Sequence, residues 1–148
     1  MNKPSIETGD WVVVCDGRKA LILENVGDAK FPNLRTRETH EHPDRPTHEQ
    51  GTSQPGRVFQ SMGHGRSAVS QTDWHDEAER TFLRNLAARL NSAVASGQAR
   101  AVTMIAAPRA LGMIRPNYST GLRAAIVQEV HKDLVKTPIA EIERTLVG

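Results

Sequence analysis

The sequence has few aromatic residues, one cysteine and no long apolar run, and each of these shortages narrows what the chain can be. Aromatic residues make up 4% of its 148 residues, so the core must consist of valine, isoleucine, leucine and alanine. Cys15 has no second cysteine to pair with, so no internal disulfide can form. No apolar run approaches the roughly 20 residues of a membrane-spanning helix, and the polar stretch Met1–Asp10 does not resemble a signal peptide. We therefore expect a protein of the reducing cytoplasm that does not enter a membrane.

The chain also lacks a strong charge of either sign. Its formal net charge is +2 and its pI is about 9.0, which neither requires nor excludes a nucleic-acid partner. Hydrophobic residues account for 38% and charged residues for 24%, as in an ordinary globular protein. A chain of this length predicts one domain spanning residues 1–148.

Three segments near the N-terminus predict an antiparallel meander. Trp11–Cys15 is a short valine-rich run typical of a buried strand. Arg18–Val26 predicts a second strand, and Asn33–Thr39 predicts a third, more exposed one. The turn residues Asp16-Gly17 and Gly27-Asp28 separate the three strands.

The second half alternates helices and strands. A long amphipathic helix is predicted from Asp73, a good N-cap residue, to a stop at Gly97. Ala101–Ala107 is apolar throughout and predicts a central strand, and Pro108 opens a short helix. Residues 125–135 fit either a strand or a continuing helix, and their alternation favours the strand. With a last helix near the C-terminus, the order is β-β-β-α-β-α-β-α, which predicts an α/β fold with a mixed sheet of about five strands flanked by helices.

Between the third strand and the long helix, residues from about 42 to 72 show no apolar periodicity. Three prolines exclude long regular structure, so a long flexible loop is predicted. Its part from Gln50 to Thr72 contains no acidic residue. Such a loop could contact RNA phosphates or a protein partner, or it could be a solvated linker. The candidate binding residues are the cations and the glycines that allow close approach: Arg57, Gly63, His64, Gly65 and Arg66.

Two other groups of residues suggest metal chemistry. His40, His42 and His48 cluster in sequence, and the first two would share one face of a strand. Their spacing matches no strong zinc pattern, so we interpret them as surface histidines and expect no metal or cofactor. Asp10, Asp16 and Glu24 lie near predicted strand ends, and a metal-dependent nuclease would need such carboxylates to converge.

Several motifs carry a resemblance to a known family. The stretch from Trp11 to Ala20 resembles the opening of the bacterial host-attachment protein family, with Cys15 where an alanine is usual. Further matches follow in order along nearly the whole chain: Gly56-Arg57-Val58-Phe59, Gly63-His64-Gly65-Arg66, the helix with Phe82 and Leu86, Pro108-Arg109-Ala110-Leu111-Gly112 and Lys132-Asp133-Leu134.

The resemblance implies a relation to the central domain of the archaeal and eukaryotic peptide-chain release factor, and hence a three-layer, ribonuclease H-like fold. In release factors the matching loop carries Gly-Gly-Gln, which helps water to cleave peptidyl-tRNA. This chain has Gly63-His64-Gly65-Arg66 there instead. We therefore expect a non-enzymatic cytoplasmic factor that presents this loop to a ribosome, RNA or protein partner. The alternative is a hydrolase, either a peptidyl-tRNA hydrolase with a degenerate loop or a metal-dependent nuclease.

Overall fold

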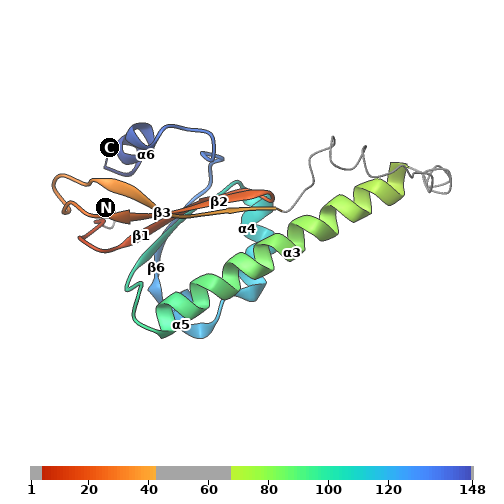
Figure 1. Ribbon diagram of the computed structural model, residues 1–148, viewed down its shortest axis with the longest axis horizontal. Helices are drawn as coiled ribbons and strands as arrows, with labels where there is room; N and C mark the ends of the chain where they lie inside the picture. The colour runs from red at the N-terminus through yellow and green to blue at the C-terminus, as the bar shows by residue number, and fades with distance from the viewer. Residues whose placement is uncertain (1–4, 43–67, 148) are drawn as a thin grey trace, which may run out of the picture.

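The computed structural model describes residues 5–42 and 68–147, and for residues 68–74 it describes the helical backbone. The chain forms a five-stranded mixed sheet with helices on both faces (Figure 1). In chain order the elements are β1 (Trp11–Cys15), β2 (Lys19–Asn25), β3 (Leu34–Glu41), α3 (Ala68–Ala95), β5 (Val102–Ile105), α4 (Pro108–Ile114), the 3-10 helix η1 (Arg115–Asn117), α5 (Thr120–Ala125), β6 (Ile126–Val130) and α6 (Ile139–Val147).

The sheet has the strand order β3-β2-β1-β5-β6. Its first three strands form the predicted antiparallel meander, and β5 and β6 run parallel to β1. The tight turn between β1 and β2 depends on Asp16, whose Oδ1 accepts from the backbone N–H groups of Arg18 and Lys19, both at 2.8 Å. The predicted mixed α/β sheet of five strands is thereby confirmed.

Successive side chains of β1 point to opposite faces of the sheet and contribute to two separate parts of the core. Trp11, Val13 and Cys15 face α3, α4 and α5, whereas Val12 and Val14 face α6. All five are completely buried, because a central strand is covered on both faces. Figure 1 shows α6 on the side of the sheet opposite α3. The apolar stripe of α3 supplies the core with Phe82, Leu83, Leu86, Ala87, Leu90 and Ala93.

Two segments differ from the sequence-based expectation by more than two residues. The helix predicted to begin at Asp73 already begins at Ala68, because residues 68–95 contain no glycine or proline to interrupt it. An N-cap preference is a weak local signal that the helix overrides here. The ambiguous segment 125–135 contains a strand, as favoured, but only over Ile126–Val130, directly after the short helix α5.

The N-terminal turns of α3 extend beyond the end of the sheet (Figure 1). In residues 75–81 no side chain is fully buried, whereas Phe82 and Leu83 begin the buried stripe. In the part of the chain that the structure describes, no helix combines the length and the apolar character needed to cross a membrane.

Candidate functional site

A cavity of about 670 Å³ lies between the end of β3 and the middle of α3. We call it the β3–α3 groove. Phe82, Leu86 and Ala78, on one stripe of α3, provide its apolar surface. It is lined by His40, Glu41, His42, Glu77, Ala78, Thr81, Phe82, Asn85 and Leu86.

The groove exists because β3 is an edge strand that α3 covers only in part. Along β3, half-buried Glu38, His40 and, just past the strand, His42 alternate with exposed neighbours, so these three side chains turn toward α3. The sequence therefore places two imidazoles and a carboxylate on the face of the strand that meets the helix. This confirms that His40 and His42 share a face.

His42 is the side chain in the groove that is best placed to receive a ligand. Its backbone N–H donates to the Arg18 carbonyl at 2.7 Å, which fixes the end of β3 against the β1–β2 turn. Its ring lies 6.3 Å from the Phe82 ring, centroid to centroid, at 44°. Its buried Nδ1 has no hydrogen-bond partner among the described residues. Buried polar atoms are normally paired, so this nitrogen is an exception among the described residues.

A charged cluster closes the inner end of the groove. Arg89 of α3 binds the Glu38 carboxylate with two groups, Nε at 3.0 Å and a terminal guanidinium nitrogen, and the Glu38 Oε1 is 2.9 Å from the His40 Nε2. The hydrogen bonds from Arg89 lower the pKa of Glu38 from 4.5 to about 2, and Glu38 in turn raises the pKa of Arg89. The Arg89 guanidinium also lies 5.7 Å from the centre of the buried Trp11 ring. These contacts hold β3 and α3 together along one side of the groove.

A second cluster lies at the carboxyl ends of the parallel strands β1 and β5. Arg109, near the start of α4, binds Glu79 of α3 at 2.5 Å and also binds Asp76. Gly17 of the β1–β2 turn approaches Glu79 so closely that a Cβ there would lie 2.7 Å from the Glu79 Cδ. A cavity of about 210 Å³ adjoins these residues. The one guanidinium binds both carboxylates, so this cluster joins α3 and α4 beside the turn.

Sequence reasoning did not identify this second cluster. The sequence identified Arg109 only as part of a family motif, and the helix that carries Asp76 begins five residues before its predicted start at Asp73. The signal in the sequence was the pair of acids one turn apart, Asp76 and Glu79, which share a helix face. Their partner lies 30 positions or more away in sequence, so only the tertiary structure brings it to them.

The predicted binding residues Arg57, Gly63, His64, Gly65 and Arg66 lie outside the described residues, as does His48. Of the histidine cluster, His40 is bound to Glu38, and His42 packs on Phe82. Within residues 5–42 and 75–147, no three His, Cys, Asp or Glu side chains are arranged to hold a metal ion.

The three carboxylates considered for a nuclease do not converge. Asp10 and Asp16 flank the five residues of β1 at opposite ends, which separates them by roughly 20 Å at about 3.3 Å per residue. Asp10 is buried and binds Arg100 at 3.0 Å, Asp16 caps the β1–β2 turn, and Glu24 binds Arg37 at 2.8 Å. Each of the three therefore has a structural partner of its own.

Cys15 is also structural, since it is the last residue of the valine-rich strand β1. It is completely buried at the end of β1. Burial raises the pKa of its thiol to about 12, and the charges of Asp16 and Asp133 act in the same direction. Because the thiolate is the reactive form, Cys15 is not a nucleophile in the folded protein.

Comparison with known proteins identifies the family. A family model described as "Protein required for attachment to host cells" matches residues 11–146. The chain belongs to this host-attachment family. It is also similar to an uncharacterised protein of Rickettsia prowazekii, with 25% identity over 144 residues that cover 91% of this chain and 90% of the relative. The matched range includes the residues of the sheet, the β3–α3 groove and the second cluster.

Proposed function

We propose that this host-attachment family member is a non-enzymatic RNA-binding factor that acts on the ribosome in the cytoplasm. Its contact surface would be the acid-free Gly51–Arg66 stretch, with the β3–α3 groove at its base. The observation that carries the proposal is the location of this groove. In the sequence, the Gly51–Arg66 stretch lies between His42 and α3. His42 lines one wall of the groove, and α3 forms the other wall.

The chemistry of the Gly51–Arg66 stretch and of the β3–α3 groove suits RNA. Arg57 and Arg66 are the only full charges in the stretch, and no carboxylate in it would repel phosphate. The groove offers the tilted ring pair of His42 and Phe82, together with the Asn85 amide beside them. Unstacked RNA bases are recognised by aromatic surfaces combined with hydrogen-bonding groups at their edges.

The ribosome is proposed as the partner because the family resemblance implies a relation to the release-factor central domain. We propose that residues 1–148 form one domain of the three-layer, ribonuclease H-like type. The strand order β3-β2-β1-β5-β6, with an antiparallel meander followed by two parallel strands, supports this assignment. The family description names attachment to host cells but no molecule that the protein contacts. The proposal names such a molecule, the ribosome.

The proposal excludes a catalytic role. The sequence contains no Gly-Gly-Gln, the thiol of Cys15 is buried, and Asp10, Asp16 and Glu24 each bind a structural partner. A peptidyl-tRNA hydrolysis assay on the full chain tests this directly. Hydrolysis that is lost in His64→Ala would show that the degenerate loop is catalytic and would overturn the non-enzymatic proposal.

The binding proposal is tested by co-sedimentation with bacterial ribosomes at increasing salt. We expect the wild-type chain to pellet at about 50 mM salt and to be released at higher salt, because phosphate contacts release counterions. The double variant Arg57→Ala/Arg66→Ala should lose most of this pelleting. The remaining salt dependence should be shallower by about 1.4 in log–log slope, at about 0.7 per phosphate contact with single strands.

A matched control removes the same charge elsewhere. Arg35→Ala/Arg144→Ala deletes two exposed arginines on β3 and α6 and should pellet like the wild type. Thr81→Trp fills the β3–α3 groove from its wall and should weaken pelleting if a base enters it. Equal pelleting of both double variants would remove the Gly51–Arg66 stretch from the proposal.

A further inference from the structure

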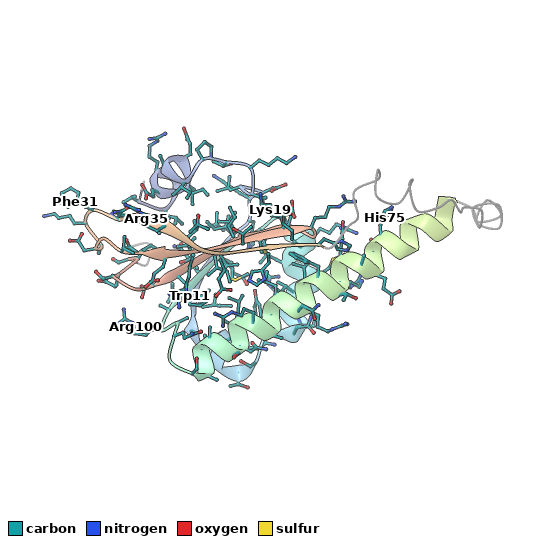
Figure 2. The ribbon with its side chains drawn as sticks, in the orientation of Figure 1. Trp11, Lys19, Phe31, Arg35, His75 and Arg100 are labelled. Carbon is teal, nitrogen blue, oxygen red and sulfur yellow. The ribbon has the colours of Figure 1, made fainter. Side chains whose placement is uncertain are left out.

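The loop between β2 and β3 carries the most exposed large apolar side chain of the described residues. Phe31 is 73% exposed, and Figure 2 shows it at the end of the molecule, directed away from the sheet. Isolated exposed apolar residues are common and need no explanation. Phe31 differs because its loop has a fixed conformation and an apolar cavity lies beside it.

Side-chain hydrogen bonds fix the loop from within. The Asp28 Oδ1 accepts from the backbone N–H of Lys30 at 3.0 Å and of Phe31 at 2.7 Å. Asn25 is completely buried, and its Oδ1 accepts from two further N–H groups of the loop, at 2.9 and 2.8 Å. A partner that covers Phe31 therefore does not have to order this loop, which removes one of the main costs of association.

The neighbouring cavity is about 230 Å³, and six of the eight described residues that line it are apolar. A dry apolar cavity of about 150 Å³ accepts a benzene molecule, so the volume of this cavity is large enough for a phenyl ring. Phe31 does not occupy the cavity, since its own ring is exposed to solvent. The cavity is lined by Ser5, Ile6, Ala29, Pro32, Leu34, Glu143, Leu146 and Val147.

The charges around the ring and the cavity are complementary. Lys30, next to Phe31, forms no ion pair with any residue that the structure describes. The one ionisable group lining the cavity is Glu143, whose Oε2 accepts from the Leu34 backbone N–H at 2.7 Å. A phenyl ring that enters the cavity from a loop of this sequence would therefore bring a lysine toward a carboxylate.

We propose that two copies of the chain form a symmetric dimer in which Phe31 of each protomer enters the cavity of the other. Ring and cavity belong to one patch, because Ala29 and Pro32 of the Phe31 loop line the cavity. A two-fold axis through such a patch makes both insertions at once. The patch lies at the opposite end of the molecule from His75 of α3 (Figure 2), so the dimer leaves the β3–α3 groove accessible and is independent of the proposed RNA contact.

Sedimentation equilibrium of the full chain over a concentration series tests the proposal. We expect a monomer–dimer equilibrium for the wild type. Phe31→Ser should raise the dimer dissociation constant at least about 100-fold, because a central aromatic contact is lost twice in a symmetric interface. Val127→Ser is the matched control: Val127 is 42% exposed on β6, the edge strand opposite β3, and its loss should leave the constant unchanged.

Mixing two variants distinguishes mutual insertion of Phe31 from nonspecific hydrophobic association. Ala29→Leu narrows the cavity but keeps Phe31, and Phe31→Ser keeps the cavity but removes the ring. Each variant alone should be monomeric. An equimolar mixture should form heterodimers of intermediate affinity, because one ring and one intact cavity remain.

Three results would overturn the proposal. The first is a wild-type chain that stays monomeric at every concentration, and the second is a dimer that Phe31→Ser does not weaken. The third is a monomer that pellets with vesicles of phosphatidylcholine and phosphatidylglycerol only while Phe31 is present, since the ring would then serve a lipid surface. Ribosome binding by the monomeric Phe31→Ser variant should match that of the wild type, so failure of either proposal is recognisable without the other.

Discussion

Replacing Glu38 by glutamine should destabilise the protein at neutral pH and have little effect in acid. The substitution keeps the shape of the side chain but removes the charge that Arg89 binds with two nitrogens. A lowering of the Glu38 pKa from 4.5 to about 2 corresponds to a ceiling of about 3 kcal/mol. Since about a quarter of each side chain is exposed to water, screening reduces the expected loss to about 1–2 kcal/mol.

The direction of the pH dependence follows from this lowered pKa. The folded protein holds Glu38 ionised down to about pH 2, whereas the unfolded chain protonates it near 4.5. The stabilisation is therefore fully present above about pH 4.5 and is lost as the pH falls toward 2. Because Glu38→Gln cannot titrate, the stability gap between wild type and variant should close over the same range.

Urea unfolding followed by circular dichroism at pH 7 and pH 2.5 measures the gap. Urea is preferred to guanidinium because it does not screen the ion pair. Glu141→Gln is the control, since Glu141 forms an exposed pair with Arg144 on α6 and its loss should change stability by less than about 0.5 kcal/mol. A gap for Glu38→Gln that is equally large at both pH values would show that the interaction is not electrostatic and would refute the reasoning.

Two other predictions concern buried groups. Cys15 should not react with a thiol reagent at pH 8 in the native protein, because burial holds the pKa of its thiol near 12. In urea it should react fully. Rapid labelling of the native protein would contradict its assignment as structural. Asn25→Ala should cost about 2–3 kcal/mol in urea unfolding, because the amide is completely buried and binds backbone groups on both sides of the β2–β3 loop. The exposed neighbour Val26→Ala, at 51% exposure, should change stability by less than about 0.5 kcal/mol.

Local sequence patterns were enough to predict most of the helices and strands. The valine run of β1 and the Asp16 turn depend on residues that are neighbours in sequence, so their structure could be predicted. The start of α3 could not, because an N-cap residue is a preference that a longer uninterrupted helix overrides. For residues 125–135 the alternation of apolar and polar residues favoured a strand without excluding a helix, because only pairing with β5 selects the strand.

For the candidate sites too, the sequence predicts some features, and others depend on tertiary contacts. That His40 and His42 share a face follows from the period of a strand, and the sequence alone supports it. That they line a groove opposite Phe82, and that the buried Nδ1 of His42 has no partner among the described residues, depends on how α3 crosses the sheet. Arg89 and Glu38 are 51 positions apart, and no spacing rule relates residues so distant.

By itself, the sequence determined the α/β class, the meander, the amphipathic stripe of α3 and the inert environment of Cys15, because each arises from the period or burial of adjacent residues. Only the tertiary structure decided which charges are paired, where the cavities lie and that Phe31 stands exposed beside one of them. Those features depend on contacts between distant segments, whose geometry is set by the packing of the whole sheet against its helices.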